Sequence, residues 1–460
     1  MFGAFLSVFL LLMIGAAALT LVCSDLGRWN LPAKIGLSFG FGLLILTVTL
    51  FIASLCGAKP TPVTGLIEAI LLLGIVVAIR RDNLAHWLPH KSEQDTSETL
   101  SLRVLAGVLF VFVIGILFVV SAASLLEPIV EWDVIAIWGL KAEVLLHEPV
   151  ITSRYFSDLP KAYSHLDYPL LWPFAMAWVW SCIGSVDLVK VKVLAPTLLA
   201  SLLFLFFGLL RRKASRPHAL FFTAVLAAIP MLLTQTSRML ADAPLAFFAL
   251  GAFVCTYLWL ESGHPDDLRI ASTFAVGMLF TKNEGIGFWF ILGIITATGL
   301  AAERRIKLLQ SAGLWLGAVP VLVMLPWFIF RSGIPKIHED YGGRINPVYF
   351  LGNLSRIPDM LGSSIRFFLN WNDWLLFWPL AFLLLILTPM HSCRRPMVFL
   401  LAGAVLPLLM YGYIYIITPW NLSDLMDATA NRLLLHVAPL WVFLFAEQVR
   451  ACKLLPFSLA

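Results

Sequence analysis

Charged residues are scarce in this chain: they make up 13% of its 460 residues, whereas hydrophobic residues make up 60% and the mean hydropathy is +0.90. A typical water-soluble protein carries about twice that share of charge. Apolar runs of 16 to 24 residues recur along the chain, and about 20 apolar residues can cross a bilayer as a helix. The sequence therefore predicts an all-α polytopic membrane protein that contacts a lipid bilayer.

Several other patterns are also absent from the sequence. Its six cysteines are scattered, without a CxxC pair or an adjacent Cys/His set, which argues against a disulfide framework and a structural zinc site. The net charge of +5 is modest and indicates orientation in a membrane rather than nucleic-acid binding. No internal repeat is evident, unlike the duplicated halves of many secondary transporters. The first 22 residues lack a basic n-region, so we expect a retained first helix and not a signal peptide.

Thirteen spanning helices are expected from the apolar runs. They cover residues 2–22, 35–56, 63–80, 103–126, 187–210, 218–234, 241–260, 269–281, 286–301, 309–330, 372–389, 397–418 and 431–449. The eighth and ninth are short for a bilayer of about 30 Å at about 1.5 Å per residue. We expect these two to form a broken pair that dips in from one surface, with 281–285 lining a cavity.

The segment 169–183 decides the topology. It has 15 residues and contains Trp172, Trp178 and Trp180, a residue type that favours the membrane interface. As a helix it would measure only about 22 Å. We therefore expect it to lie flat on the membrane surface.

Counting basic residues then predicts the orientation. With 169–183 flat, the short loops and helix ends on one side carry 18 lysines and arginines, and the short loops on the other side carry 4. Cytoplasmic loops carry the positive excess. We expect an inner (plasma) membrane protein with its N-terminus outside, its C-terminus in the cytoplasm, and the long loops 127–192 and 331–371 outside.

Changes in composition divide the chain into three parts. Residues 1–102 form three helices and a polar cytoplasmic linker, and residues 103–330 hold the charged residues that stand out. Residues 331–460 add a Gly/Pro-rich outer loop and three helices. This outer loop is basic enough to attract anionic head groups, or it is simply solvated. Its basic residues include Arg331, Lys336, His338, Arg344 and Arg356.

Two acidic residues follow the fourth predicted helix. Glu131 and Asp133 lie at the mouth of the first long outer loop, and a carboxylate near an apolar surface is well suited to take a proton from a hydroxyl. The alternative for Asp133 is an interfacial acid that pairs with Lys141 or caps a short helix.

His165, Asp167 and Tyr168 end the same loop, just before Pro169. Asp167 is a second candidate acid, but Asp167 or Tyr168 could equally lie at the cap of a helix that starts at Pro169. His165 could ligate a metal, although a lone histidine is more often a hydrogen-bonded loop residue. We predict no metal site.

Arg238 and Asp242 are four residues apart, so on a continuous helix they would face the same side and pair. Pro244 instead predicts a helix that starts near Asp242 and makes this residue an N-cap. The guanidinium of Arg238, at the mouth of a membrane cavity, suits a phosphate oxygen.

Lys282 and Glu284 interrupt two apolar segments. The ammonium of Lys282 would neutralise a phosphate leaving group as its negative charge develops, or it would form a salt bridge with Glu284 or another outer carboxylate. Arg432 opens the last helix and is a further phosphate-binding candidate, or an interfacial anchor. His436, one turn deeper, would line the same cavity.

In their order along the chain and their predicted location on one side of the membrane, these motifs resemble the GT-C membrane glycosyltransferases. The resemblance is specifically to the superfamily of protein O-mannosyltransferases and bacterial lipid A aminoarabinose transferases. The matching pieces are Trp132-Asp133, Asp167-Tyr168-Pro169-Leu170, Arg238, Ala241-Asp242-Ala243-Pro244 and Thr281-Lys282-Asn283-Glu284-Gly285. The resemblance covers roughly residues 103–330. The chain departs from the family in its three preceding helices, in a single proline at 169, and after residue 330, where it matches no acceptor domain that we can name.

The resemblance implies a GT-C-like fold, with juxtamembrane helices in the first outer loop and a catalytic module at 103–330. It implies that Asp133 is the catalytic base and that Lys282 and Arg238 lie near the donor phosphate. The donor would be a polyprenyl-phosphate sugar, and the acceptor a hydroxyl of an extracytoplasmic glycan, lipid or protein, with no cofactor. The alternatives are a transporter or flippase for a lipid-linked sugar, and a non-catalytic subunit for envelope assembly.

Overall fold

The computed structural model describes residues 1–87, 99–335, 341–388 and 395–455. The chain is 82% helical, without a strand in these ranges. Within them, ten helices are long and apolar enough to cross a membrane, or up to eleven if a bent pair counts as one span. The predicted all-α polytopic membrane architecture is therefore confirmed. Lys336, His338 and much of the predicted polar linker lie outside the described residues.

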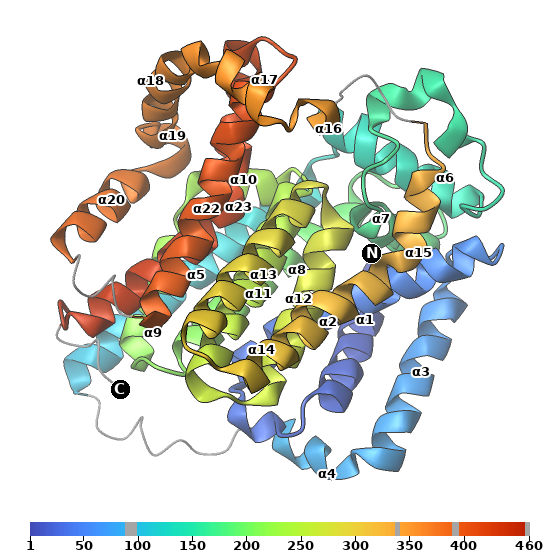
Figure 1. Cartoon of the computed structure of the whole chain (residues 1–460). Coiled ribbons are helices and arrows are strands. Elements are labelled where there is room, and N and C mark those ends of the chain that lie inside the picture. Colours follow the sequence, from blue (N-terminus) through green and yellow to red (C-terminus); the bar gives the residue numbers. More distant parts are fainter. Residues whose placement is uncertain (88–98, 336–340, 389–394, 456–460) are drawn as a thin grey trace.

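The ten candidate spans run through most of the length of the chain (Figure 1). They are α1 (Phe2–Val22), α2 (Leu31–Leu55), α3 (Pro62–Ile79), α5 (Leu100–Leu126), η7 with α8 (Lys190–Val193, Leu194–Leu210), α11 (Asp242–Ser262), α13 (Glu284–Ala302), α14 with η8 and α15 (Ile306–Ala312, Gly313–Ala318, Val319–Ser332), α22 (Arg395–Ile417) and α23 (Leu422–Ala451).

Shorter helices connect the spans. They include α4 (Arg81–Leu84), η4 (Val134–Gly139), α6 (Leu140–His147), α7 (Leu171–Ile183), α9 (Arg216–Ala227), α10 (Pro230–Ser237), α12 (Pro265–Thr281), α16 (Tyr341–Arg344), α17 (Pro347–Gly352), α18 (Ile357–Phe368), α19 (Trp371–Trp374) and α20 (Phe377–Leu387).

Three of the thirteen predicted spans differ from the structure. Segment 218–234 is the bent pair of α9 and α10, which meet at an angle of 64° because Pro230 has no backbone N–H to continue the helix. Segment 372–389 contains α20, which has only 11 residues. Segment 269–281 is the last part of α12, which begins four residues earlier, has 17 residues in all and is not among the candidate spans.

The prediction of two half-helices around Lys282 is wrong. α12 begins at Pro265, earlier than expected, and α13 has 19 residues and is itself a candidate span. The expected segment began at residue 269 and left out Asp266 and Asp267, which lie in the first turn of α12. Both side chains are fully buried and paired in the structure, so the helix includes them.

The tryptophans of 169–183 do not contact lipid, as their residue type suggested, but are buried inside the protein. The position of this segment flat on the membrane surface stays a prediction. α7 is too short to span, but residues 171–180 are all buried, and α7 packs against α1, α2 and α6. Each indole N–H reaches a backbone carbonyl: Trp172 that of Met239, Trp178 that of Ser7 and Trp180 that of Asp187. A buried tryptophan satisfies its N–H in this way, so the residue type indicated burial and not a lipid interface.

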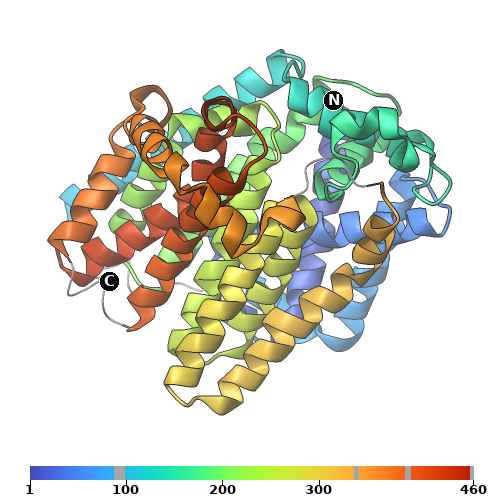
Figure 2. The same cartoon turned by 45° about the horizontal axis from the view of Figure 1, so that its top comes forward.

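α11 forms the centre of the molecule. It is buried from Asp242 to Trp259 and contacts α8, α10, α12, α13, α22 and α23. The loops 127–170 and 341–376 lie at one end of the bundle, which we call the loop end, on opposite sides of it (Figures 1 and 2). The start of α11 and the turn between α12 and α13 face this loop end.

The first two helices are part of this bundle. A Cβ on Gly15 of α1 would lie 1.7 Å from the Ser38 carbonyl oxygen of α2, and one on Gly42 would lie 2.0 Å from that of Leu11. Glycine at both positions therefore lets the two backbones touch, as in other close helix pairs in membranes. α2 also packs on α8 and α12. The three-part division of the chain stays a prediction.

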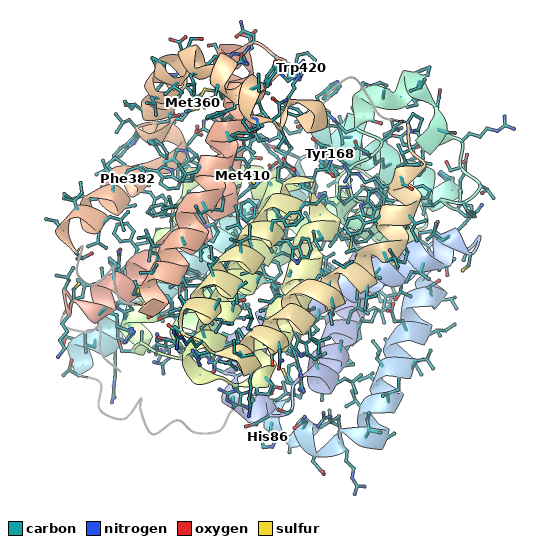
Figure 3. All side chains as sticks on the ribbon, viewed as in Figure 1. His86, Tyr168, Met360, Phe382, Met410 and Trp420 are labelled. Carbon is teal, nitrogen blue, oxygen red and sulfur yellow. The ribbon has the colours of Figure 1, made fainter. Side chains whose placement is uncertain are left out.

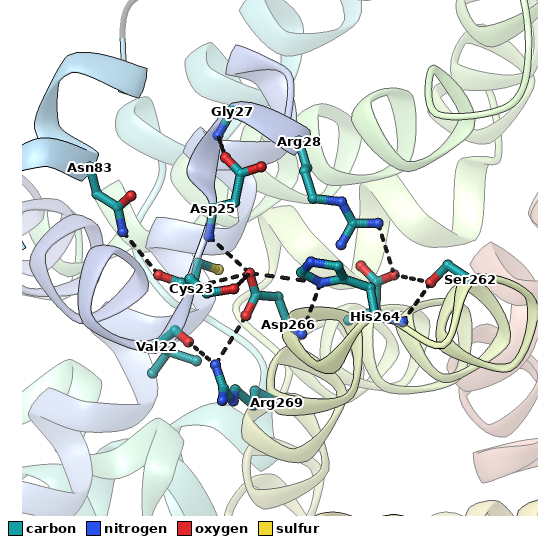
Figure 4. Close-up of polar contacts among 12 residues, drawn as sticks. Val22, Cys23, Asp25, Gly27, Arg28, Asn83, Ser262, His264, Asp266 and Arg269 are labelled. Atoms are coloured by element: carbon teal, nitrogen blue, oxygen red, sulfur yellow. Dashed lines mark hydrogen bonds and ion pairs between the residues drawn. The ribbon is translucent and has the colours of Figure 1, made fainter. Parts of the chain in front are cut away.

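A network of charges closes the opposite end of the bundle (Figure 4). Asp266 accepts hydrogen bonds from the backbone N–H and hydroxyl of Ser24 at 2.8 and 2.9 Å and from Arg269 at 3.1 Å. Asp267 pairs with Arg212 at 2.6 Å and lies 3.8 Å from Arg28. These contacts join the α11–α12 turn to the segments after α1 and α8.

Candidate active site

Asp242 is the centre of a second charge network, at the loop end. It is the first residue of α11 and is 0% exposed. Its Oδ1 accepts from Lys282 Nζ at 2.9 Å and from His436 Nε2 at 2.8 Å. Its Oδ2 accepts from the Nε and NH2 groups of Arg432 at 3.2 and 3.1 Å. These donors and the positive end of the α11 dipole compensate a charge that burial would otherwise make costly.

The two roles expected for Asp242 are therefore wrong. The N-cap of α11 is Ala241, and no side chain caps the helix. Arg238 pairs with Glu131 at 3.0 Å and not with Asp242. The turn between α10 and α11 separates Arg238 from Asp242, because Met239 has a positive φ of 65°.

Arg432 links this buried carboxylate to Asp133. Its NH1 group lies 2.5 Å from Asp133 Oδ2, while its other two nitrogens face Asp242. A planar guanidinium can serve two carboxylates at once, which an ammonium does less well. The Asp133 side chain is 27% exposed, so it lies at the boundary between the buried network and the outside.

Asp133 does not pair with Lys141, so that alternative is wrong. Lys141 is buried in α6 and donates to the carbonyls of Ser164 and His165 at 2.7 and 2.6 Å. Burial lowers the pKa of Lys141 to about 7, against a smaller opposing effect of Asp167. Lys141 thus fixes the backbone just before Asp167.

Lys282 lies in the turn between α12 and α13 and is buried. Its ammonium is 2.9 Å from Asp242 and 3.0 Å from Glu284. Burial alone would lower the pKa of Lys282, but the two carboxylates outweigh it and raise the pKa above its usual value. Lys282 is therefore protonated and forms salt bridges with two acids. A salt bridge with Glu284 was the alternative that the sequence left open.

Gly285 allows this turn to close. A Cβ at Gly285 would lie 2.0 Å from the carbonyl oxygen of Met278, a backbone atom that cannot move aside. Only glycine lets the start of α13 approach the end of α12 this closely. The position of Lys282 and Glu284 depends on that approach.

His436 connects the network to α22. Its Nδ1 is 2.6 Å from the hydroxyl of Tyr411, and its other ring nitrogen faces Asp242. Both His436 and Tyr411 are buried. The sequence suggested His436 as a neighbour of Arg432 but gave no sign of Tyr411, which is one of several aromatic residues in an apolar helix.

Asp167 belongs to a neighbouring pair and not to a helix cap. It accepts from Arg331 at 2.8 Å and from the side-chain amide of Asn283 at 3.2 Å. The N-cap of α7 is Leu170, without a side-chain cap, so the capping role expected for Asp167 or Tyr168 is wrong. Asn283 directly follows Lys282, and this brings Asp167 close to the network. Arg331 was noted in the sequence only as part of a basic loop.

His165 and Tyr168 support that loop. His165 has a left-handed backbone with φ of 51°, and its ring stacks on Tyr168 with centroids 4.5 Å apart. Tyr168 marks this region at the loop end, far from His86 at the opposite end (Figure 3). Among the described residues, no group of three or more His, Cys, Asp or Glu side chains could hold a metal ion.

The exposed edge of the site is formed by Glu131, Trp132 and Arg238. The side chain of Arg238 is 53% exposed and that of Glu131 30%. Trp132, next to Asp133, is 60% exposed. An accessible carboxylate, an exposed aromatic ring and an exposed guanidinium therefore lie at this edge of the site.

The network has no free cation within the described chain. Lys282 and Arg432 each contact two carboxylates, and Arg238 contacts one. At Lys282 and Arg432 an anionic ligand would have to replace a carboxylate. Of the two carboxylates on Arg432, Asp133 can leave more easily, because Asp242 is fully buried and held by several donors.

Comparison of the chain with known protein families and with curated protein sequences finds no match.

Proposed function

We propose that this protein is a membrane glycosyltransferase that moves a sugar from a polyprenyl-phosphate donor to a hydroxyl of an extracytoplasmic glycan, lipid or protein. The observation that carries the proposal is the contact of Asp133 with Arg432. It brings a partly exposed base candidate and a phosphate-binding candidate together at one end of a membrane bundle. A donor from the lipid and an acceptor from water could both reach this end.

The donor phosphate displaces Asp133 from the NH1 group of Arg432. A phosphate offers the same pair of oxygens to a guanidinium as a carboxylate does, with more charge. Asp242 keeps the other two nitrogens of Arg432 in place, so the exchange needs no movement of the buried part. Asp133 is then free to accept a proton.

The reaction exchanges one bond at the anomeric carbon for another and transfers one proton. Asp133 accepts the proton of the acceptor hydroxyl as its oxygen attacks the anomeric carbon of the sugar. The bond between that carbon and the phosphate oxygen breaks, and the electron pair leaves with the polyprenyl phosphate. Arg432, with Arg238 at the exposed edge of the site, stabilises the charge that develops on the phosphate. The exposed ring of Trp132 can support the apolar face of the sugar.

Lys282 is a positioning residue in this proposal and does not contact the phosphate directly. It is buried behind Arg432, and it fixes Asp242, which in turn orients the guanidinium. His436 contacts the same oxygen of Asp242 as Lys282 does. This changes the role expected from the sequence, where Lys282 was the first choice for the phosphate.

A transporter for a lipid-linked sugar predicts charged groups on both faces of the membrane, and the bundle has a charge network at each end. At the opposite end, however, Asp266 and Asp267 are 0% exposed, and each is held by several partners that join neighbouring loops. That network explains the closure of the bundle without a substrate. It therefore does not favour transport.

Analysis of envelope glycans by mass spectrometry tests the proposal. A deletion strain should lose one sugar modification, and expression of the unchanged protein should restore it. Expression of Arg432→Met, which removes the phosphate-binding group, should not restore it. Glu148→Gln is the control, because Glu148 is exposed in the same loop and has no ion pair among the described residues. Full restoration by Arg432→Met, or an unchanged glycan profile in the deletion strain, would contradict the proposal.

A further inference from the structure

A groove lies between α2 on one side and α12, η8 and α15 on the other. Its volume is about 470 Å³. No residue of the Asp242 network lines it. The groove therefore needs an explanation other than the proposed reaction.

The wall of the groove is apolar along the helices. Leu44, Ile45, Val48, Val276 and Val323 line it. The hydroxyl of Thr49, at the far end, already donates to Glu68 of α3 at 2.8 Å. The middle of the groove thus offers a ligand apolar contact and no hydrogen-bond donor from these residues.

Two arginines lie at the other end of the groove. Arg269 donates to Asp266 at 3.1 Å and to the carbonyl of Val22 at 3.2 Å, and its guanidinium lies 5.7 Å from the ring of Trp315. Arg80, at the end of α3, has no ion pair within the described part of the chain. With Asp266 counted against Arg269, Arg80 is the one lining residue whose positive charge has no ion pair among the residues that the structure describes.

The dimensions of the groove suit one acyl chain of one leaflet. On α2 the lining runs from Phe41 to Thr49, a rise of about 12 Å at about 1.5 Å per residue. Half of a hydrocarbon core of about 30 Å is about 15 Å. An acyl chain that lies along α2 would therefore place its head group at Arg80 and Arg269.

We propose that this groove is a binding site for an anionic phospholipid, with its phosphate between Arg80 and Arg269 and an acyl chain along α2. The single uncompensated charge favours a lipid with a net charge of −1 over a zwitterionic lipid, which has no net charge to offset it. Trp315 lies beside the head group, in the position that tryptophan favours at a membrane interface. The proposal does not depend on the glycosyltransferase reaction.

Native mass spectrometry of the purified full-length protein tests this site. The protein in mild detergent is titrated with dioleoylphosphatidylglycerol or dioleoylphosphatidylcholine, and bound lipids are counted. The unchanged protein should retain one phosphatidylglycerol in preference to phosphatidylcholine. Arg80→Ala should lower that preference about fivefold, which corresponds to about 1 kcal/mol for one basic residue at a membrane surface. Arg80→Lys should keep most of it, because the charge is retained.

Arg81→Ala is the matched control, since Arg81 is the next residue but does not line the groove. Val48→Trp, which fills the apolar part, should reduce retention of both lipids. Equal binding of the two lipids by the unchanged protein, or an equal loss in Arg80→Ala and Arg81→Ala, would overturn the proposal. Displacement of phosphatidylglycerol by polyprenyl phosphate at equal concentration would also overturn it and assign the groove to an isoprenoid chain.

Discussion

At the scale of single residues, the site depends on one buried carboxylate that orients all its neighbours. Asp242 holds Lys282, Arg432 and His436, and only Arg432 extends from there to the accessible Asp133. Breaking a buried pair costs more than its net contribution suggests, because one charge remains without a partner. The buried members are therefore expected to affect stability, and Asp133 to affect turnover.

Lys282→Met should lower the stability of the protein by about 3–5 kcal/mol, because it leaves Glu284 and one oxygen of Asp242 without their cation. The double variant Lys282→Met/Glu284→Gln should recover part of this loss, since it removes the stranded charge. Thermal unfolding in detergent measures both. Lys59→Met is the control, because Lys59 is exposed and should change stability by less than about 0.5 kcal/mol. A double variant less stable than Lys282→Met would contradict the network.

Lys141 predicts a dependence of stability on pH. Burial lowers its pKa from the usual 10.5 to about 7 in the folded protein. Between these values the unfolded chain binds more protons than the folded one, so stability should increase as the pH rises from 7 to 10. The slope is at most about 1.4 kcal/mol per pH unit. Below pH 7 both states are protonated and this contribution stays at its minimum.

Thermal unfolding of the unchanged protein and of Lys141→Met between pH 7 and pH 9.5 measures this effect. The variant should show a smaller increase in midpoint with pH. Lys161→Met, in the same loop, should keep the full increase. Identical slopes in Lys141→Met and the unchanged protein would show that Lys141 does not titrate in this range.

At the scale of elements, the turn between α12 and α13 positions the site. Gly285→Ala would bring a Cβ to 2.0 Å from the Met278 carbonyl oxygen, so the two helix ends must separate and Lys282 must move away from Asp242. We expect activity to fall at least about tenfold, the effect of about 1.4 kcal/mol on the barrier. Gly293→Ala in the same helix has open space around its Cβ and should leave activity unchanged. Equal activity of the two variants would rule out this role of Gly285.

Some elements were predictable from sequence and others were not, for physical reasons. The apolar runs gave α1, α3 and α5 nearly to the residue, because length and composition determine a membrane span. Partners across the bundle were not predictable, because they are far apart in sequence. Arg432 and Asp133, which are in contact, are 299 residues apart. The tryptophans of α7 were assigned to the wrong environment, because an indole suits both an interface and a core that offers a carbonyl.

The candidate residues of the site could likewise be recognised one by one, but their partners could not. Asp133, Asp242, Lys282, Glu284 and Arg432 could be recognised because charges in apolar surroundings are costly and therefore few. Their pairing could not, since a sequence does not show which helices are neighbours. Tyr411 gave no signal at all, because a tyrosine in an apolar helix does not stand out by composition.

At the scale of the whole molecule, the bundle has two different ends. The loop end carries the Asp242 network with the exposed side chains of Trp132 and Arg238, and the opposite end holds the ion pairs of Asp266 and Asp267. The excess of basic residues in short loops predicts that the opposite end faces the cytoplasm. Donor chemistry would then occur outside.

Single cysteines in a cysteine-free background test this orientation. Arg154→Cys at the loop end should react with an impermeant thiol reagent in intact cells, and Asp82→Cys at the opposite end should not. Both positions are exposed, so both should react after permeabilisation. The reverse pattern in intact cells would overturn the predicted orientation.

The most direct measurement of the central claim is sugar transfer by purified protein in lipid nanodiscs, with radiolabelled polyprenyl-phosphate sugars and an envelope extract as acceptor. Asp133→Asn keeps the shape of the side chain but removes the proton acceptor, so turnover should fall by about two orders of magnitude or more. Binding of the donor should persist, because Arg432 remains, and Glu148→Gln should match the unchanged protein. Transfer by Asp133→Asn at the rate of the unchanged protein would contradict the assignment of Asp133 as the base, and the absence of transfer from every donor tested with the unchanged protein would contradict the enzyme itself.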